Sequence, residues 1–313
     1  MPQQSFDAYV THLNSLSQEL YYSGSLQDAI VLVEANVQAA QTLEMPAETR
    51  ARLLMNYVEL LIADMMLSGR EANTIEPVLD IAQVATDATN SQALQVEILL
   101  LRGQLTHQIA LSSEEGDFAH SLEFTQPALQ LCRELDNTEL LCKALFWVGL
   151  AHQFLEETED ARTHFEEACA VAREHHHRLP LSYSVRHLGF LQAADGDLES
   201  ARASLEESLA LREELQFLPY LPFSHISVAE IARQQGDVEA AHQHLEKAAS
   251  FAEDTKNQRA RMMAFVGLGQ LADEAGDDST ARANYQQALE IAEALQHAGY
   301  QAHIGQLLAE LKG

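Results

Sequence analysis

The sequence predicts an all-α protein built as a solenoid of helical hairpins. Alanine, leucine, glutamate and glutamine dominate the chain, and segments that alternate apolar with polar residues, as strands do, are missing. The sequence also repeats itself with a period of about 40 residues over much of its length. Within each repeat, apolar residues recur at three- and four-residue steps, which is typical of amphipathic helices. A fixed period of this size indicates stacked repeat units.

The repeat is clearest where segments that begin at Val148, Leu188, Val228 and Leu268 align without a gap. Small and large residues keep their places in all four segments. The small positions are Gly149, Gly189, Ala229 and Gly269, followed by Ala161, Ala201, Ala241 and Ala281, and the large position holds Phe165, Leu205, Leu245 and Tyr285. One more unit precedes them near Gly116, so we expect regular repeats over residues 102–295.

Each repeat unit is predicted to form a helix, a tight turn and a second helix. The turn is a Gly-Asp pair in three units, at 196–197, 236–237 and 276–277. Glycine can adopt the left-handed conformation that ends the first helix, and aspartate can cap the amides that begin the second. Glu156 and Glu157 replace this pair in another unit, so that turn should be less favourable. The small residue at Gly189 lets the two helices approach closely, with Leu205 filling the space beside it.

The two ends of the chain depart from the regular repeat. Residues 1–95 are expected to form two irregular hairpins, around Gly24 and Gly69, because their spacing is longer than the period of the regular repeats. Residues 300–313 should form a capping helix whose apolar side covers the last repeat. We find no linker rich in proline, glycine or serine, and therefore expect residues 1–313 to form a single solenoid of about seven hairpins plus the capping helix.

Composition narrows the possible functions. The chain has 19 lysines and arginines against 47 acidic residues, a net charge of −28, which disfavours binding to nucleic acid or to an anionic membrane. No long apolar run or signal segment is present, so we expect a cytoplasmic protein. Three cysteines, at 132, 142 and 169, fit reduced and mostly buried thiols.

The sequence lacks the common catalytic and cofactor-binding motifs, so we expect no enzyme activity, no cofactor and no metal. Three consecutive histidines at 175–177 suggest a metal site or an exposed helix end, and the helix end is favoured because adjacent side chains point about 100° apart. The same argument disfavours a metal pair at His242 and His244. Trp147 is expected either to pack between repeats or to contact a partner.

The pattern of large and small residues resembles the tetratricopeptide repeat. In one unit it consists of Phe265, Leu268, Gly269, Ala272, Ala281, Tyr285 and Ala288. Two departures are the period of 40 rather than about 34 residues and the missing proline at the end of each unit. Extended repeats of this kind are similar to those in sensor domains of bacterial transcriptional regulators and in scaffold proteins. The resemblance implies a right-handed superhelix with a concave groove, and it implies no reaction.

In this family the first helix of each unit lines the groove, and the resemblance therefore identifies candidate groove residues. They are Lys143, Phe146, Leu150, Tyr183, Arg186, Phe190, Phe223, Ile226, Arg233, Met263 and Gln270. Cationic and aromatic residues together suit a protein or peptide segment that carries an acidic or carboxylate group. Alternatively, the cations pair with neighbouring glutamates.

The predicted function is a non-enzymatic scaffold that binds a protein or peptide segment in its groove. The alternative is a peptide- or partner-responsive sensor that regulates a target through another protein. The sequence leaves open the identity of the partner and the oligomeric state.

Overall fold

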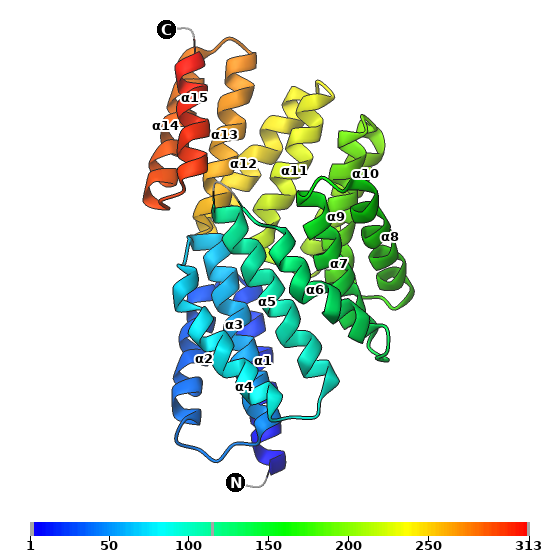
Figure 1. The fold of residues 1–313 in the computed structure, drawn as a ribbon. Coiled ribbons are helices and arrows are strands. Elements are labelled where there is room, and N and C mark those ends of the chain that lie inside the picture. The colour runs from blue at the N-terminus through cyan, green and yellow to red at the C-terminus, as the bar shows by residue number, and fades with distance from the viewer. Residues whose placement is uncertain (1–2, 114–115, 312–313) are drawn as a thin grey trace. The chain divides into compact units, whose positions relative to one another are not determined.

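The computed structural model describes residues 3–113 and 116–311 of the chain. The described residues form fifteen α-helices and two short 3₁₀ helices and contain no strand, which confirms the predicted all-α class (Figure 1). The N-terminal elements are α1 (Gln3–Tyr22), α2 (Leu26–Ala40), α3 (Ala47–Ser68), η1 (Ala72–Thr74), α4 (Glu76–Asp87), α5 (Gln92–Ser112), α6 (Ala119–Cys132), α7 (Thr138–Phe154) and α8 (Thr158–Glu174). They are followed by α9 (Arg178–Ala194), α10 (Leu198–Glu214), η2 (Leu218–Tyr220), α11 (Leu221–Gln234), α12 (Val238–Asp254), α13 (Gln258–Glu274), α14 (Asp278–Ala294) and α15 (Ala298–Glu310).

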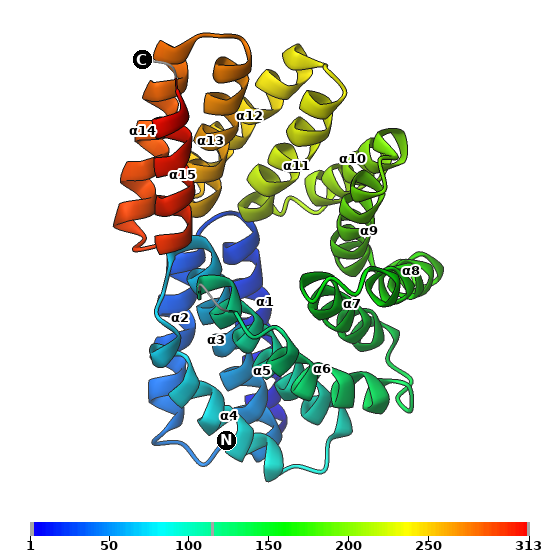
Figure 2. The same ribbon diagram turned by 45° about the horizontal axis from the view of Figure 1, so that its top comes forward.

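The helices follow one another as seven hairpins, from α1/α2 to α13/α14, with α15 left over as the predicted capping helix. The chain divides into two compact units, of which the first holds mainly α1–α8 and the second holds residues from Ser182 onward. In the second unit, each helix from α10 to α15 packs against the next one, and α11 also packs against α13 (Figure 2). This contact pattern is that of stacked hairpins and confirms the predicted fold class. The single solenoid over residues 1–313 stays a prediction.

Helix length explains the period of the repeat. Each of α7, α8, α9, α10, α12, α13 and α14 has 17 residues, and three-residue connections separate most of them. One such helix with its connection fills half of the period, and a hairpin with both of its connections fills the whole. Longer helices, rather than longer turns, thus account for the difference from the usual repeat.

Every connection from α7 to α15 contains one left-handed residue. Within three hairpins this residue is Gly196, Gly236 or Gly276, as predicted, with φ from 73° to 86°, and between α7 and α8 it is Glu156. Between hairpins it is a residue with a side chain: His176, Gln216, Lys256 or Gln296. These second turns were not predicted from the sequence, because only glycine is a recognisable signal for positive φ.

The aspartates of the Gly-Asp turns cap the second helices as predicted. Asp197 accepts a hydrogen bond from the Ser200 amide at 3.1 Å, and Asp237 and Asp277 repeat the contact. In the exceptional unit, Glu156 takes φ 63° and Glu157 makes no side-chain cap. That turn keeps its shape without the two favoured residues, and its weaker stability stays a prediction.

The capping helix α15 covers the apolar end of the last hairpin. Ile304 is fully buried, and Leu311 packs into the same cluster as Tyr285 and Ala292. The last two residues of the predicted capping segment, 312–313, lie outside the described residues. Among the helices that the structure describes, none is long and apolar enough to span a bilayer. All three cysteines are free and buried, as predicted.

Candidate functional site

A cavity of about 180 Å³ lies in the second unit among α11, α12, α13 and α15. Side chains one helical turn apart on α11 and α13 form most of its wall, because residues three and four apart share a helix face. Its lining consists of Ile226, Ala229, Glu230, Arg233, Leu245, Met263, Val266, Gly267, Gln270, Tyr300 and His303. Four predicted groove residues, Ile226, Arg233, Met263 and Gln270, therefore meet at one cavity. Apolar groups form much of its wall, while charged and polar groups are also present.

Gly267 lines this cavity where α13 packs closely on α12, at a position that was not predicted from the sequence. A Cβ atom at Gly267 would lie 2.6 Å from Cδ2 of Leu245, so a side chain here would collide with the wall from α12. Tyr300 and His303 were also missed, because α15 was considered only as a cap. The available signal for Gly267 was a second glycine close to Gly269. Gly269 belongs to the repeat pattern, whereas Gly267 does not.

The cation at the cavity, Arg233, is fully engaged by carboxylates of its own chain. Its Nη2 donates to Oε1 of Glu230 at 2.7 Å and its Nε donates to Oε2 at 3.0 Å. Nη1 pairs with Glu274. Although burial alone would raise the pKa of Glu230, hydrogen bonds from Arg233 and Gln234 hold it below its usual value. This cation follows the alternative of pairing with neighbouring glutamates.

A second group of predicted residues forms a cationic and aromatic cluster at α9. Nε and Nη2 of Arg186 donate to Oγ of Ser227 on α11 at 3.2 and 3.0 Å, and its guanidinium lies 4.5 Å from the ring centre of Phe190. Nη1 of Arg212 donates to Oγ of Ser224 at 2.8 Å, and this guanidinium lies 5.1 Å from the Tyr183 ring. We call Tyr183, Arg186, Phe190, Arg212 and Tyr220 the arginine cluster.

Burial strongly affects the charge of this cluster. Burial and, to a smaller extent, the nearby charge of Arg212 lower the pKa of Arg186 to about 9. Among the described residues no carboxylate contacts the Arg186 guanidinium. Tyr183, Arg186 and Phe190 were predicted from the sequence, whereas Arg212 and Tyr220 were not.

The repeat alignment contained the signal for Arg212. The chain has Ala172 one repeat before Arg212, and Ala252 and Ala292 one and two repeats after it. Arginine thus occupies a position where the other units have alanine, and its side chain is 1% exposed. A buried arginine in a position that is otherwise alanine points to a local polar requirement.

The three remaining predicted residues of the first unit lie on α7. Lys143 pairs with Glu139, at 3.5 Å between Nζ and Oε1, and also faces the carboxylates of Glu59 and Glu97. Phe146 and Leu150 are only 7% and 6% exposed. These two side chains contribute to the packing of the first unit, which corrects their expected exposure to a partner.

Phe223 on α11 is half-buried, with its ring centre 6.0 Å from that of Tyr220.

Trp147 packs against the core. It lies against a cluster of the first unit that includes Leu145 and Val148, and its ring centre is 5.3 Å from that of Phe146. Of the two roles considered, the structure shows packing.

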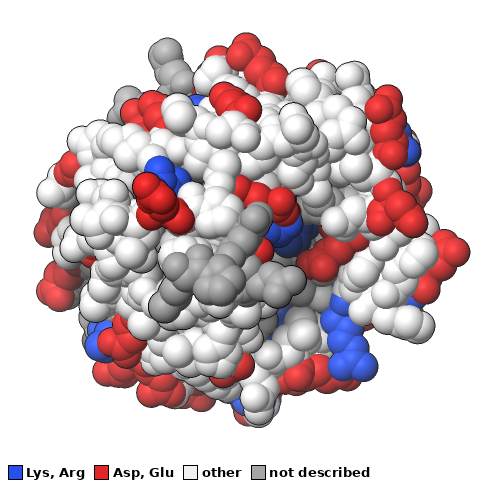
Figure 3. Space-filling model, turned by 90° about the horizontal axis from the view of Figure 1, so that it is seen from below, with Lys and Arg blue, Asp and Glu red and all other residues white. Residues whose placement is uncertain are grey.

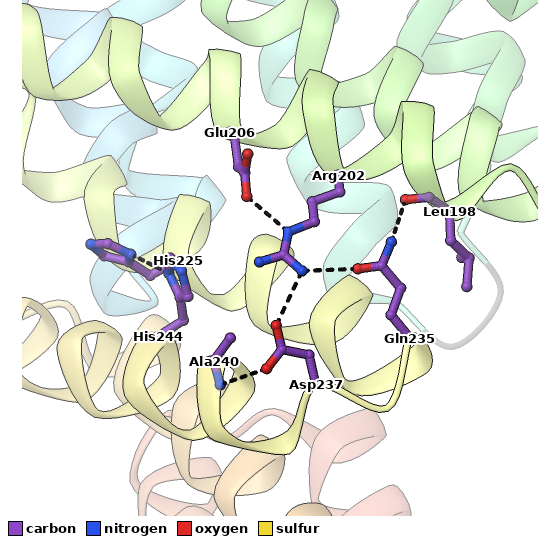
Figure 4. Close-up of polar contacts among 8 residues, drawn as sticks. All are labelled: Leu198, Arg202, Glu206, His225, Gln235, Asp237, Ala240 and His244. Atoms are coloured by element: carbon purple, nitrogen blue, oxygen red, sulfur yellow. Dashed lines mark hydrogen bonds and ion pairs between the residues drawn. The ribbon is translucent and has the colours of Figure 1, made fainter.

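The histidines are distributed over separate contacts. His177 lies 2.8 Å from Oγ1 of Thr138, and His176 serves as a left-handed turn residue. His242 faces Glu246, whereas His244 points to His225, with 2.9 Å between their Nδ1 atoms (Figure 4). The rings of His175 and His177 stack with their centres 6.0 Å apart, whereas His242 and His244 contact different residues.

One cluster could hold a metal ion by the chemistry of its donors. His152, Glu157 and Asp160 lie at the turn between α7 and α8, with their ligand atoms within 4.8 Å of one another. Nδ1 of His152 is 2.5 Å from Oε2 of Glu157, and both carboxylate residues are exposed. A histidine bonded to a solvated carboxylate accounts for this arrangement without an ion.

Acidic side chains are spread over the molecular surface. Figure 3 shows one face with many aspartates and glutamates and few lysines and arginines, in keeping with the net charge of −28. Several of the visible cations lie next to acidic groups. The close-up in Figure 4 shows the same behaviour at Arg202, which contacts Glu206, Gln235 and Asp237.

Comparison with known proteins connects this architecture to a family. The model of the MalT-like TPR region matches residues 97–296, which is more than half of the chain. No curated protein matches the sequence.

Several solved structures share the fold at low sequence identity. A Rap protein in complex with the competence and sporulation factor aligns with a TM-score of 0.72 at 13% identity, covering 97% of this chain and 85% of that one. NprR in complex with its cognate peptide NprX aligns with a TM-score of 0.63 at 15% identity, covering 98% and 82%. A signal transduction ATPase with a tetratricopeptide repeat sensor from Pyrococcus horikoshii aligns with a TM-score of 0.57 at 10% identity, covering 90% of this chain and 42% of that one.

Proposed function

Because the chain belongs to the MalT-like TPR family, we propose that it is a non-enzymatic scaffold that binds a protein or peptide segment on the face formed by α9, α11 and α13. The observation that carries the proposal is the cavity in the second unit, where four predicted groove residues meet. Its apolar wall suits one apolar side chain of a bound segment, and the amide of Gln270 suits the segment's backbone.

Binding at this site needs no covalent chemistry. An apolar side chain in the cavity would release water from Ile226, Met263 and Val266, which favours association. The helices are preorganised by their packing in the second unit, so little conformational entropy is lost on the receptor side. A cytoplasmic location is part of the proposal.

A second candidate function is a peptide-responsive sensor that acts through another protein. It is supported by the similarity in fold to the Rap and NprR complexes, each of which was solved with a signalling peptide or factor. Sensor and scaffold share the site and differ in its consequence. In a sensor, the bound segment changes the affinity for a second protein.

The experiment that tests the site uses a pool of random decapeptides and fluorescence-based binding to the purified chain. Met263→Trp should fill the cavity and weaken binding of the retained peptides by at least about tenfold, whereas Val238→Trp serves as the matched control. Val238 is 54% exposed on α12 and lies outside the cavity. Equal binding by the parent and Met263→Trp, with unchanged helicity, would contradict the assignment of the cavity.

The second step separates the scaffold from the sensor. Proteins that co-purify with the chain are quantified with and without the strongest peptide from the pool. In a scaffold, the partner and the peptide compete for the same cavity. Met263→Trp should then weaken the binding of the partner as well as the binding of the peptide. A sensor gains or releases a partner whose own binding is insensitive to Met263→Trp.

A further inference from the structure

Arg186 occupies a position where the other repeats have apolar residues. One repeat before it the chain has Phe146, and one and two repeats after it the chain has Ile226 and Val266. Arg212, its cationic neighbour, similarly replaces alanine in the same unit. Two arginines therefore enter one repeat at positions where apolar packing satisfies the fold elsewhere. The other repeats have apolar residues at both positions.

The charge of Arg186 is not compensated within the described part of the chain. Its polar contacts are two hydrogen bonds to the same hydroxyl, Oγ of Ser227, which itself donates to the carbonyl of Phe223 at 2.8 Å. Nη1 donates to no described residue. The remaining contact is with the face of Phe190, a cation–π interaction that leaves the charge in place. Burial, and to a smaller extent the charge of Arg212, lower the pKa of Arg186 to about 9.

The other two cations of the predicted groove behave differently. Lys143 has Glu139 as a partner, and Arg233 has Glu230 and Glu274. In a chain with 47 acidic residues against 19 basic ones, a half-buried arginine without a carboxylate is an exception. An exception of this kind is expected where a ligand supplies the anion. An uncompensated charge lowers the stability of the fold, and it is retained where function requires it.

The arginine cluster is also close to the proposed binding cavity. Ser227, the hydrogen-bond partner of Arg186, is adjacent in sequence to Ile226, which lines the cavity. A bound segment that reaches from α13 across α11 toward α9 would therefore pass from the cavity to Arg186. The two features differ in chemistry, since one suits an apolar side chain and the other an anion.

We propose that Arg186 is the receptor for a carboxylate of the bound protein or peptide segment, and that Arg233 has no such role. The inference rests on the proposed function, which it extends by specifying the chemistry of the partner. The guanidinium lies over the face of Phe190 and is anchored by Ser227, so its remaining N–H groups can donate to both oxygens of a carboxylate. The carboxylate belongs either to an aspartate or glutamate side chain or to the C-terminus of the segment.

The test uses four pools of random decapeptides that share all uncharged residues. Two pools contain aspartate and glutamate, and the other two contain asparagine and glutamine in their place; each kind is made with a free C-terminus and with a C-terminal amide. The parent should retain a pool with a carboxylate about tenfold better than the fully amidated pool. If only the pools with acidic side chains are retained better, the side chains supply the carboxylate. If only the pools with a free C-terminus are retained better, the C-terminus supplies it.

Two variants assign the preference to a residue. Arg186→Gln should abolish the preference for carboxylate while weaker binding through the cavity remains. The matched control is Arg202→Gln on α10, which removes the same charge outside the cavity and should keep the preference. If Arg186→Gln retains the preference, the inference is overturned and the proposed function stands. If the parent retains no pool at all, the proposed function fails and the inference fails with it.

Thermal unfolding distinguishes recognition from a structural role. Arg186→Met should melt at the same temperature as the parent or higher, because it replaces an uncompensated cation by an apolar chain at a position that is apolar in the other repeats. A melting temperature several degrees lower would show that the guanidinium serves the fold, and would overturn the inference.

Discussion

Gly269 of α13 lies against the ring of Tyr285 of α14 so closely that a Cβ atom on the glycine would be 2.4 Å from Cε1 of the tyrosine. The same relationship, with the same separation in sequence, joins Gly149 to Phe165 and Gly189 to Leu205, where the corresponding distances are 2.9 and 3.0 Å. The alternation of small and large residues is therefore what sets the distance between the two helices of a hairpin.

We expect Gly269→Ala to destabilise the protein by about 1–3 kcal/mol, because Tyr285 is fully buried and cannot move aside without disturbing its own packing. The free energy of unfolding in urea measures the effect. Gly305→Ala on α15 is the control: nothing lies within 4 Å of its added Cβ, and alanine should stabilise that helix by up to about 1 kcal/mol. Equal stability of Gly269→Ala and the parent would contradict the close approach.

The repeat register, the hairpin count and the Gly-Asp turns could be predicted because the packing of this fold repeats the same contact in each unit. Gly189, Asp197 and Leu205 have the same structural role as their counterparts one repeat later, so self-comparison detects them without a structure. The capping helix was predictable for the same reason, since its apolar stripe has to cover the last hairpin.

The candidate site was less predictable, because it depends on departures from the repeat. Arg186 and Arg233 are both cations on the first helix of a hairpin, yet only Arg233 meets a carboxylate, Glu274, on the next hairpin. Whether a cation pairs with a carboxylate of the next hairpin depends on side-chain contacts between hairpins, and sequence spacing does not determine these contacts. Phe146 was predicted to face a partner, but neighbouring rings at Trp147 and Phe165 enclose it instead.

We expect Glu156→Gly to stabilise the protein by about 1 kcal/mol. Glu156 has φ 63°, a left-handed conformation that costs a residue with a side chain about 1–2 kcal/mol and costs glycine little. The midpoint and slope of urea unfolding, followed by circular dichroism, measure the change. Gly196→Ala is the reciprocal control and should destabilise by a similar amount, because its Cβ would meet nothing within 4 Å and only the backbone conformation is affected. A loss of stability in Glu156→Gly would mean that the Glu156 side chain makes a contribution larger than the strain.

We expect the cysteines to resist alkylation in the folded protein. Burial raises the pKa of Cys132 to about 11 and that of Cys142 to about 12, so almost no reactive thiolate is present at pH 8. Iodoacetamide labelling followed by mass spectrometry should modify the native chain far more slowly than the chain in urea. Rapid labelling of either cysteine in the native state would show that the surrounding hairpin opens.

The buried pair of His225 and His244 should make stability depend on pH. His225 is 2% exposed, and its Nδ1 atom lies 2.9 Å from the Nδ1 atom of His244. Its ring stacks on that of Phe251, with 5.7 Å between the ring centres. Burial lowers its pKa to about 4, and the charges of His244 and Lys247 act in the same direction. Burial also lowers the pKa of His244, which in addition faces Lys247, Glu206, Arg202 and Asp237.

The direction of the effect follows from proton binding. Between pH 6.5, the usual value for histidine, and pH 4, the unfolded chain binds a proton at His225 that the folded chain does not bind. The stabilising contribution of the neutral imidazole is therefore complete above pH 6.5 and is lost as the pH falls toward 4, by up to about 3 kcal/mol. The free energy of unfolding at pH 7.5 and pH 4.5 should differ less in His225→Gln than in the parent. The comparison cancels the titration of the many carboxylates, which both chains share, and an identical pH dependence of the two would contradict the assignment to His225.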